Sequence, residues 1–295
     1  MRQLPDLMIE PVVRAALLED LGRAGDVTAQ ACIPDGARLR AIVGARKAGV
    51  LAGIDCVRLA VLAMDPKAAI DIHVRDGEAF EAGTRLAEIE GDARALLSAE
   101  RTALNLLGRL CGVATLTREY VRAVDGTGAR IADTRKTTPG LRALEKHAVV
   151  CGGGINHRFG LDDAILIKDN HVAVCGGVGP AVRRARAMAG HLMKVELEVD
   201  GLDQLDQALA LFDEGEAGQR WGPDVIMLDN FTLEDMRVAV GRAATFRAQR
   251  GLVLEASGGV TLTTVRAIAD TGVDVISVGA LTHSAAALDV GLDAI

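Results

Sequence analysis

The sequence is poor in aromatic residues, with one tryptophan, one tyrosine and five phenylalanines among its 295 residues. Proteins that bind single-stranded nucleic acids usually stack the bases on aromatic side chains, so this scarcity disfavours that mode of binding. The formal net charge of −7 also disfavours non-specific attraction to nucleic-acid phosphates. We therefore expect no nucleic-acid partner.

Long apolar runs are missing as well. No stretch reaches the roughly 20 residues that a membrane span needs, and the segment Met1 to Asp6 does not start an apolar signal peptide. The five cysteines include Cys56, Cys111, Cys151 and Cys175, form no C-x-x-C pair, and lie in a chain that is too long to need disulfide staples. We expect reduced thiols, mostly in the core, in a cytoplasmic protein with no membrane partner.

The first third of the chain has the pattern of a compact α+β unit. Residues 10–21 are predicted to form a helix that ends near a glycine. Strand-like runs follow at 39–43, 70–74 and 85–89, with glycines between them. From residue 93 to residue 110 the leucines recur at helical spacing, which predicts a long helix.

Six short apolar runs follow residue 128, and each ends in polar or glycine residues. They occupy residues 130–132, 164–167, 195–199, 225–228, 252–255 and 273–278. Helical patterns separate most of them, over 178–189, 202–213, 233–249 and 262–270. The repeat of roughly 20–35 residues is the size of a βα unit, and strands that are apolar throughout suit a parallel sheet covered on both faces.

This repeat predicts an α/β fold with a β/α barrel, in which functional groups follow the carboxyl ends of successive strands. An open doubly wound sheet is the alternative. No G-x-G-x-x-G sequence follows the first run, which disfavours that alternative. Only six runs are clear, so a complete barrel of eight strands would need further strands in weaker sequence.

Cationic residues gather between Asp133 and His171, although the protein as a whole is acidic. The group comprises Arg135, Lys136, Arg142, Lys146, Arg158 and Lys168, together with His147, His157 and His171. Arginine binds carboxylate or phosphate through two parallel hydrogen bonds, and lysine acts as a compact point charge. Some of these charges could be a solvated face, but Arg135, Lys136 and Lys168 directly follow apolar runs and are expected at one barrel mouth. We predict a site for an anionic small molecule.

Glycines follow the last two apolar runs. Ser257-Gly258-Gly259 comes after the fifth run, and Gly279 comes after the sixth. In β/α barrels the last two loops after the strands commonly bind phosphate through backbone N–H groups, and we predict that role here. The run Gly152-Gly153-Gly154 is a weaker signal, since most glycine runs are only loops.

Two carboxylates, Glu198 and Asp229, end neighbouring runs and could face the same cavity. In such a position they could bind sugar hydroxyls, hold magnesium through water, or stabilise a developing positive charge. Ion pairs with the nearby lysines are the alternative. Glu196 lies on the same side of the strand as Glu198, so periodicity does not choose between them.

Three segments resemble the quinolinate phosphoribosyltransferase family. They are Thr134-Arg135-Lys136-Thr137-Thr138-Pro139-Gly140, Gly152-Gly153-Gly154-Ile155-Asn156-His157-Arg158 and Ile167-Lys168-Asp169-Asn170-His171. Shorter matches occur in the family's order along almost the whole chain, at Glu19-Asp20-Leu21-Gly22, Gly25-Asp26, Glu100-Arg101-Thr102, Glu196-Leu197-Glu198, Leu228-Asp229-Asn230 and Ala256-Ser257-Gly258-Gly259.

The resemblance implies an N-terminal α+β open-faced sandwich over residues 1–114 and an incomplete β/α barrel over residues 115–283, which would account for the missing strands. The tail 284–295 is expected to pack on the sandwich. The resemblance also implies a homodimer or higher multiple, in which Arg101 of the neighbouring subunit completes each site. The implied reaction is decarboxylating transfer of the phosphoribosyl group of phosphoribosyl pyrophosphate to quinolinate, which gives nicotinate mononucleotide, pyrophosphate and carbon dioxide in NAD biosynthesis.

The family pattern further implies a role for each site residue. Quinolinate carboxylates would be bound by Arg101, Arg135, His157, Arg158 and Lys168, with Thr134 beside them. Lys136 and Lys168 would contact the phosphoribosyl donor, and Glu198, rather than Glu196, would pair with Asp229 at the ribose hydroxyls. The 5′-phosphate would lie against Ser257, Gly258, Gly259 and Gly279. Magnesium would be carried by the pyrophosphate, with water bridges to the two carboxylates, and the catalytic residues would be Lys136, Lys168, Glu198 and Asp229.

One segment departs from the family pattern. Residues 211–222, which include Trp221, are longer than the family needs, and we expect a surface insertion away from the barrel mouth. Two other functions remain as alternatives. One is a Schiff-base aldolase that uses Lys168. The other is a non-catalytic anion-binding relative, against which the presence of both carboxylates and the full cationic set argues.

Overall fold

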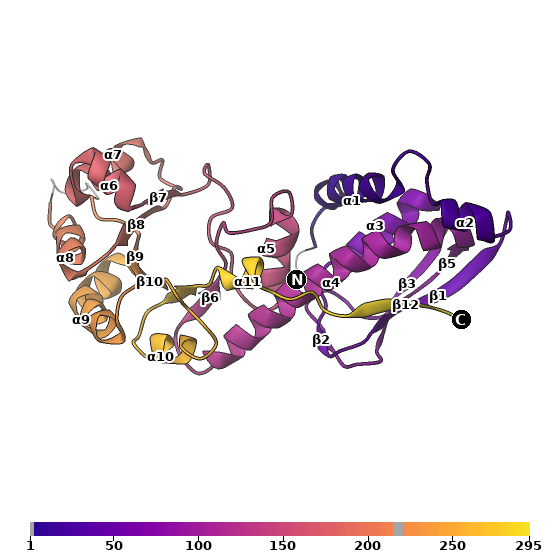
Figure 1. Ribbon diagram of the computed structural model, residues 1–295. Helices are drawn as coiled ribbons and strands as arrows, with labels where there is room; N and C mark the ends of the chain where they lie inside the picture. The colour runs from indigo at the N-terminus through magenta and orange to yellow at the C-terminus, as the bar shows by residue number, and fades with distance from the viewer. Residues whose placement is uncertain (1–2, 215–220) are drawn as a thin grey trace. The chain divides into compact units, whose positions relative to one another are not determined.

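The computed structural model describes residues 3–214 and 221–295, which form two compact units (Figure 1). Unit 1 consists of Met1–Arg118, Lys136–Gly154 and Ala280–Ile295, and unit 2 consists of Glu119–Arg135 and Ile155–Gly279. Each unit is described by itself. No helix in the described ranges is both long enough and apolar enough to cross a membrane.

Unit 1 is built on an antiparallel sheet of four described strands in the order β12-β1-β5-β3. These strands are β1 (Arg38–Ala45), β3 (Ala69–Ile72), β5 (Arg85–Asp92) and β12 (Val290–Ala294), and β2 (Gly49–Val50) pairs separately with β4 (Ala79–Phe80). The helices are α1 (Asp6–Leu21), α2 (Val27–Cys32), α3 (Ile54–Met64), α5 (Arg142–Cys151), α11 (Ala280–His283) and α4 (Ala93–Ala123), whose last five residues are counted in unit 2. Beside the indigo β1, Figure 1 shows the yellow β12, so the last strand of the chain completes the sheet that the first strand begins.

The sheet and helices of unit 1 follow from local sequence. In β5 the buried and exposed positions partly alternate, as expected for a strand with one face on the core. Helix α3 buries Cys56, Val57, Ala60 and Val61, and the Asp76 carboxylate accepts hydrogen bonds from the backbone N–H groups of the residues at its start. An acidic group at a helix N-terminus satisfies donors that have no partner within the helix.

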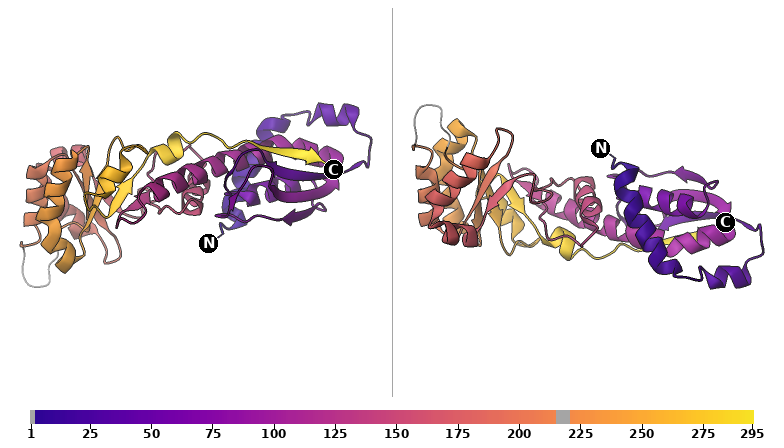
Figure 2. Two further views of the ribbon diagram at one scale, coloured as in Figure 1. Left: turned by 90° about the horizontal axis from the view of Figure 1, so that it is seen from below. Right: turned by 90° about the horizontal axis from the view of Figure 1, so that it is seen from above.

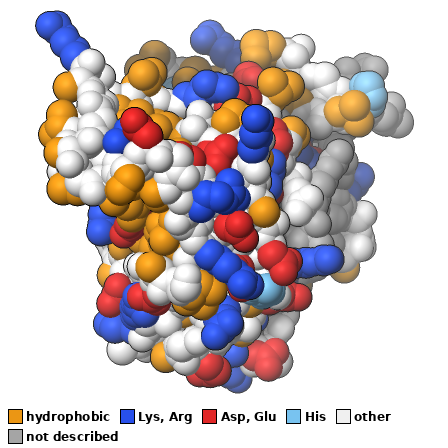
Figure 3. All heavy atoms as spheres, turned by 90° about the vertical axis from the view of Figure 1, so that its right-hand side faces the viewer, with side chains coloured by type: hydrophobic (Ala, Val, Ile, Leu, Met, Phe, Trp, Pro, Cys, Tyr) orange, Lys and Arg blue, Asp and Glu red, His pale blue; other side chains and the backbone are white. Residues whose placement is uncertain are grey.

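On the face of the molecule shown in Figure 3, basic and acidic side chains are interspersed, with apolar side chains between them. Neighbouring strands of unit 1 place opposite charges together, as in the ion pairs Arg38–Glu90 and Arg40–Glu88 between β1 and β5. Cross-strand pairs of this kind favour one register of the sheet.

Unit 2 contains a parallel sheet whose six described strands have the order β6-β11-β10-β9-β8-β7. The strands are β6 (Arg130–Ala132), β7 (Ile165–Ile167), β8 (Val195–Val199), β9 (Val225–Asp229), β10 (Val253–Ser257) and β11 (Val275–Ser277). The helices are α6 (Asp169–Cys175), α7 (Val178–Met188), α8 (Leu202–Ala210), α9 (Leu233–Arg250) and α10 (Val265–Ala269). Helices of this unit stack on one side of the strands (Figure 2).

The prediction of an α/β fold with an incomplete β/α barrel is confirmed. All six apolar runs form the parallel strands, and β8 is buried at every position. Strands β6 and β7 are the two edges, and no ladder joins them in the part of the chain that the structure describes. A parallel sheet with helices outside it places the carboxyl ends of all its strands at one edge, which is where a barrel holds its active site.

Several helix boundaries differ from the sequence-based expectation. Helix α4 continues to Ala123 instead of stopping near residue 110, and α8 ends at Ala210 instead of 213. Helix α10 begins at Val265 instead of 262, because the hydroxyls of Thr261 and Thr264 bond each other and nearby backbone in a turn before the helix. Of the predicted insertion 211–222, residues 215–220 lie outside the described part of the chain.

The cysteines behave as expected for reduced core thiols. None of the five forms a disulfide within the described ranges, and Cys56, Cys111 and Cys151 are buried, Cys175 is half-buried and Cys32 is exposed. Burial raises the pKa of Cys56 and of Cys111 to about 12, because the thiolate loses its hydration. The buried thiols are therefore poor nucleophiles.

Candidate active site

The polar residues at the mouth of unit 2 are brought together by strand register. Asp229 ends β9 directly opposite Ser257, which ends β10, and Glu198 in β8 lies opposite Met227 in β9. Lys168 follows β7 as the N-cap of α6, and Arg135 follows β6. The predicted residues of unit 2 therefore share the carboxyl edge of one parallel sheet, as the barrel prediction requires.

Lys168 and Glu198 form an ion pair, with the lysine Nζ 2.5 Å from the glutamate Oε2. The Glu198 side chain is 9% exposed, whereas the Lys168 side chain is 47% exposed. The Lys168 backbone N–H donates to Nδ1 of His171, which fixes the turn from β7 into α6. In the protein alone, the ion-pair alternative that the sequence left open for Glu198 is therefore observed.

Asn230 forms hydrogen bonds with Asp229 and with Ser257, which precedes the glycine turn after β10. Its backbone has a φ of 55°, its Nδ2 donates to the Asp229 carboxylate at 2.7 Å, and its N–H donates to the Ser257 carbonyl at 2.9 Å. Gly258 has a φ of 93°, and a Cβ there would lie 2.1 Å from the Asn230 Oδ1. Only glycine fits this position, because the backbone is left-handed and the neighbouring amide fills the space.

Beneath the cationic residues lies a buried group of one histidine and two glutamates: His157, Glu196 in β8 and Glu255 in β10. The His157 Nε2 is 2.9 Å from Glu196 and 3.7 Å from Glu255. Its Nδ1 accepts the backbone N–H of Arg158 at 2.8 Å. These bonds assign the Nε2–H tautomer, with Glu196 as the acceptor of that proton.

Burial and a neighbouring charge change the pKa of Glu255. Glu196 is 7% and Glu255 is 4% exposed. Loss of hydration, followed by the charge of Glu196, raises the pKa of Glu255 to about 7, against the opposing effects of His157 and Ser277. Glu255 therefore retains a proton near neutral pH more readily than an ordinary glutamate.

Asp133 ties the loop that carries His157 and Arg158 to the end of β6. It is fully buried, and its two carboxylate oxygens accept the backbone N–H of His157 at 2.9 Å and the Nδ2 of Asn156 at 2.6 Å. The bridge between Ala132 and Ile155 aligns the same loop with the strand. A buried carboxylate bound in this way fixes the direction in which the next side chains leave the backbone.

The guanidinium groups of Arg135 and Arg158 have N–H donors that make no hydrogen bond within the described residues. The Nε atoms of both are buried and make no hydrogen bond within the described residues, while Arg158 donates from Nη1 to the Ala164 carbonyl at 3.1 Å. Burial, and then the charge of Arg135, lower the pKa of Arg158. Two close, partly desolvated cations with unused donors are poised to bind a ligand with two negative charges.

The remaining predicted residues fall in both units. Thr134 and Gly279 belong to unit 2 with the strand-end residues. Arg101, which is exposed on α4, and Lys136, which is also exposed, belong to unit 1. The Lys136 carbonyl accepts a hydrogen bond from the Thr282 hydroxyl within that unit.

Family models match almost the whole chain. The model of the quinolinate phosphoribosyl transferase C-terminal domain matches residues 113–293, and that of the N-terminal domain matches residues 26–111. The chain belongs to the quinolinate phosphoribosyltransferase family. The resemblance carried by the three central motifs is thereby confirmed.

Members of this family from other organisms are similar over nearly their full length. The nicotinate-nucleotide pyrophosphorylase [carboxylating] of Mycobacterium leprae is 47% identical over 286 residues, which cover 95% of each chain. A probable enzyme of the same name from Bacillus subtilis is 42% identical and covers 97% of this chain and 93% of its own. The solved nicotinate-nucleotide pyrophosphorylase of Francisella tularensis superposes with a TM-score of 0.89 at 38% identity, covering 99% of this chain and 98% of its own.

Sequence reasoning missed several residues that shape the site. Glu255 and Asp133 received no role, although each is a carboxylate at the end of an otherwise apolar run, a pattern that marks a buried acid. From the sequence, Asn230 received no role beyond its place in the motif Leu228-Asp229-Asn230. No periodicity could have paired it with Gly258, because that contact joins loops after two different strands.

Proposed function

We propose that this chain catalyses decarboxylating phosphoribosyl transfer from phosphoribosyl pyrophosphate to quinolinate, with nicotinate mononucleotide, pyrophosphate and carbon dioxide as products. The observation that supports this most directly is the pair Arg135 and Arg158, whose buried Nε atoms have no partner among the described residues. Quinolinate carries two adjacent carboxylates that such a pair can bind. The reaction is a step of NAD biosynthesis, which fits a cytoplasmic enzyme.

In this proposal the quinolinate carboxylates lie against Arg135, Arg158 and Lys168, with Thr134 and His157 completing the pocket. The His157 ring is already hydrogen-bonded on both nitrogens, to Arg158 and to Glu196, so it contributes its position and its ring face. Arg101 is assigned to the neighbouring subunit of a homodimer. Its exposure on α4 is compatible with a role outside its own subunit.

The phosphoribosyl donor is assigned to the strand ends. Lys136 and Lys168 neutralise its phosphates, and Ser257, Gly258, Gly259 and Gly279 hold the 5′-phosphate through backbone N–H groups. Glu198 and Asp229 bind the ribose hydroxyls. Gly258 and Gly259 both have positive φ, and left-handed backbone of this kind occurs in turns that bind anions through backbone N–H groups.

The residues at this mouth are suited to magnesium bound through water, not to magnesium bound directly by side chains. Glu198 and Asp229 supply the oxygen ligands that magnesium prefers, but Glu198 already pairs with Lys168. Neither of the two groups of three metal-ligand side chains found among the described residues includes Glu198 or Asp229. An ion carried by pyrophosphate, with water bridges to the two carboxylates, agrees with this arrangement, and it would neutralise the leaving group.

The proposed chemistry requires no protein nucleophile. Pyrophosphate leaves the anomeric carbon, and the carboxylates Glu198 and Asp229 stabilise the positive charge that develops on the ribose. The pyridine nitrogen of quinolinate then forms the bond to that carbon. When the C2 carboxylate leaves as carbon dioxide, the electron pair of the broken bond remains on C2, where the adjacent positively charged nitrogen stabilises it, and C2 then takes up a proton. The protein supplies position and charge complementarity.

The Schiff-base alternative is less well supported. A lysine that attacks a carbonyl must present a neutral amine, and such lysines usually lie in apolar or cationic surroundings. Lys168 instead donates to the carboxylate of Glu198 and is about half exposed. Borohydride trapping with carbonyl substrates distinguishes the two: the proposed reaction gives no trapped adduct, and a trapped adduct at Lys168 would favour an aldolase.

The deciding experiment measures carbon dioxide release from carboxyl-labelled quinolinate. Release that needs quinolinate, phosphoribosyl pyrophosphate and magnesium together, with nicotinate mononucleotide formed, is the expected result. A folded protein that releases none would leave only the fold and family membership, and would refute the proposed reaction.

A mixing experiment tests the assignment of Arg101 to the neighbouring subunit. Arg101→Ala and Asp229→Asn are each expected to be inactive as homodimers. Subunit exchange between them forms hybrids in which one site has both native residues, so activity should return on mixing. Activity that stays absent after exchange is verified by mass spectrometry would place Arg101 in the site of its own subunit.

A further inference from the structure

A second buried polar cluster lies in unit 1 around Glu145, which is 0% exposed on α5. Its Oε1 accepts hydrogen bonds from Nη2 of Arg109 at 2.8 Å and from Nε at 3.1 Å. The Thr138 hydroxyl donates to Oε1 at 2.8 Å, and the Thr138 N–H donates to Oε2 at 2.9 Å. The carboxylate therefore has a charged partner and a complete set of donors.

Arg109 connects this carboxylate to the C-terminal part of the chain. It lies on α4 and also donates to the carbonyls of Ala285, at 2.7 Å, and Thr282. Gly112 permits this approach, since a Cβ there would lie 2.0 Å from the Ala286 carbonyl oxygen. The segment after α11 can therefore run close enough to α4 for one guanidinium to bond two of its carbonyls.

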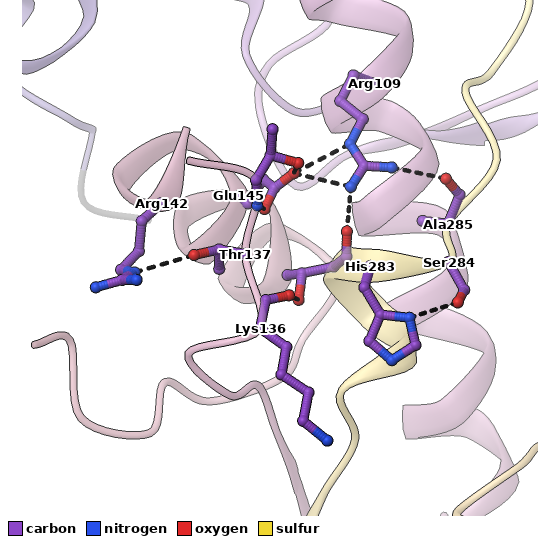
Figure 4. Close-up of polar contacts among 10 residues, drawn as sticks. Arg109, Lys136, Thr137, Arg142, Glu145, His283, Ser284 and Ala285 are labelled. Atoms are coloured by element: carbon purple, nitrogen blue, oxygen red, sulfur yellow. Dashed lines mark hydrogen bonds and ion pairs between the residues drawn. The ribbon is translucent and has the colours of Figure 1, made fainter. Parts of the chain in front are cut away.

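The two ends of the segment 136–138 are held by this network. The Thr282 hydroxyl donates to the Lys136 carbonyl at 2.8 Å, and Glu145 binds the N–H and hydroxyl of Thr138. Between them, the Thr137 hydroxyl accepts from Nε of Arg142 at 3.0 Å. Figure 4 shows the Lys136 side chain extending away from the cluster of Arg109 and Glu145. The network therefore holds the backbone of this lysine, and the residue itself is exposed.

Stability alone is a weak reason for such a cluster. Removing two charges from water costs several kcal/mol, and well-packed apolar residues often replace a buried ion pair with no loss of stability. What apolar residues cannot do is bind the N–H of Thr138 and the carbonyls of the 282–285 segment. The network is therefore suited to orienting the backbone at Lys136.

We propose that Glu145, together with Arg109, is a positioning residue that fixes the backbone of Lys136, so that its ammonium group meets the phosphates of the phosphoribosyl donor. Neither residue touches a substrate. The inference rests on the proposed function, because that function assigns the donor to Lys136.

The test compares the binding of each substrate to Glu145→Gln in the full-length protein. The amide keeps the shape but places an NH2 group against Arg109 or the Thr138 N–H, where only acceptors fit. Affinity for phosphoribosyl pyrophosphate with magnesium is measured by calorimetry, and so is affinity for quinolinate alone. We expect the donor to bind about ten- to a hundredfold more weakly, and quinolinate to bind within about twofold of the wild type.

Two further variants separate positioning from folding. Thr138→Val removes one hydroxyl from the cluster and leaves the charged pair intact, so a smaller loss of donor affinity in the same direction is expected, and this variant carries the test if Glu145→Gln does not fold. Arg186→Gln breaks a comparable buried ion pair, Arg186–Asp224, in unit 2, with side chains 12% and 8% exposed. It should lower the melting temperature and leave donor affinity unchanged.

The outcomes separate the failure of this inference from that of the proposed function. Wild-type protein that binds neither substrate refutes the proposed function. Wild-type protein that binds both, with folded Glu145→Gln and Thr138→Val that bind the donor as well as the wild type, refutes the positioning role. Equal weakening of both substrates also refutes it, because that result indicates general disorder of the site.

Discussion

Two buried polar clusters of this protein, one around Glu145 and one at the mouth of unit 2, differ in whether their hydrogen bonds are complete. Around Glu145 every donor and acceptor named above has a partner inside unit 1. At the mouth of unit 2, the Nε atoms of Arg135 and Arg158 and one oxygen each of Glu196 and Glu255 are buried without a hydrogen bond. A network with all its hydrogen bonds made holds a backbone in place, whereas unused donors and acceptors are able to bind a ligand.

The largest effect is expected where the incomplete cluster loses a cation. Arg135→Ala should weaken quinolinate binding by about 2–5 kcal/mol, because a buried charge-assisted contact is lost. Calorimetry with quinolinate measures this directly. Arg135→Lys is the matched control and should recover only part of the affinity, since a point charge does not replace a bidentate fork. Unchanged quinolinate affinity in Arg135→Ala would contradict the proposal that the unused donors of the cluster in unit 2 bind quinolinate.

Glu198→Ala is expected to act on turnover more than on affinity. Loss of a group that stabilises the developing positive charge should lower kcat by about 10²–10³-fold, while the KM values change less. Steady-state kinetics with both substrates measures this. Removing the partner of Lys168 also alters its environment, so Glu198→Gln serves as a control that keeps the hydrogen bond. A pure KM effect would contradict a transition-state role.

The pH dependence of stability distinguishes the two clusters through Glu255. Its pKa is raised to about 7 in the folded protein, so the folded state binds more protons than the unfolded state between the ordinary glutamate pKa of about 4.5 and about 7. Its contribution to the unfolding free energy is therefore present below that window and lost as the pH rises through it, by a few kcal/mol at most.

Thermal unfolding of wild type and Glu255→Gln from pH 4.5 to pH 8 measures this contribution. The groups that face Glu255 are Glu196, His157, Asp133 and Ser277. The melting temperature of the wild type should fall relative to that of the glutamine variant as the pH rises. Parallel curves over this range would show that Glu255 has an ordinary pKa.

Gly258→Ala is expected to have the smallest effect, and it separates strain from binding. The substitution forces a side chain into a left-handed backbone and against the Asn230 amide, at a cost of about 1–3 kcal/mol. It should also raise the KM for the donor, because the backbone N–H groups of this turn move. Gly259→Ala, where the structure leaves open space, is the control and should cost less. Equal melting temperatures for wild type and Gly258→Ala would contradict the assigned clash.

The arrangement of several residues of the candidate site was predictable because its signal is local. Arg135, Lys168, Glu198 and Asp229 follow or end apolar runs, and parallel strands bring such positions to one edge. The pairs His157–Glu196 and Glu145–Arg109 were not predictable in this way. Their partners lie 39 and 36 residues apart, on different elements, and only packing decides which buried acid meets which base.

By itself the sequence determined the six parallel strands, the reduced thiols and the family, because apolar periodicity and contiguous motifs are properties of short segments. The tertiary structure decided the rest. It buried Glu255, joined the N–H of Asn230 after β9 to the Ser257 carbonyl at the end of β10, and joined the Lys136 carbonyl to Thr282 across 146 positions of the chain. Hydration and hydrogen-bond partners depend on which segments meet in space, and no local pattern contains that information.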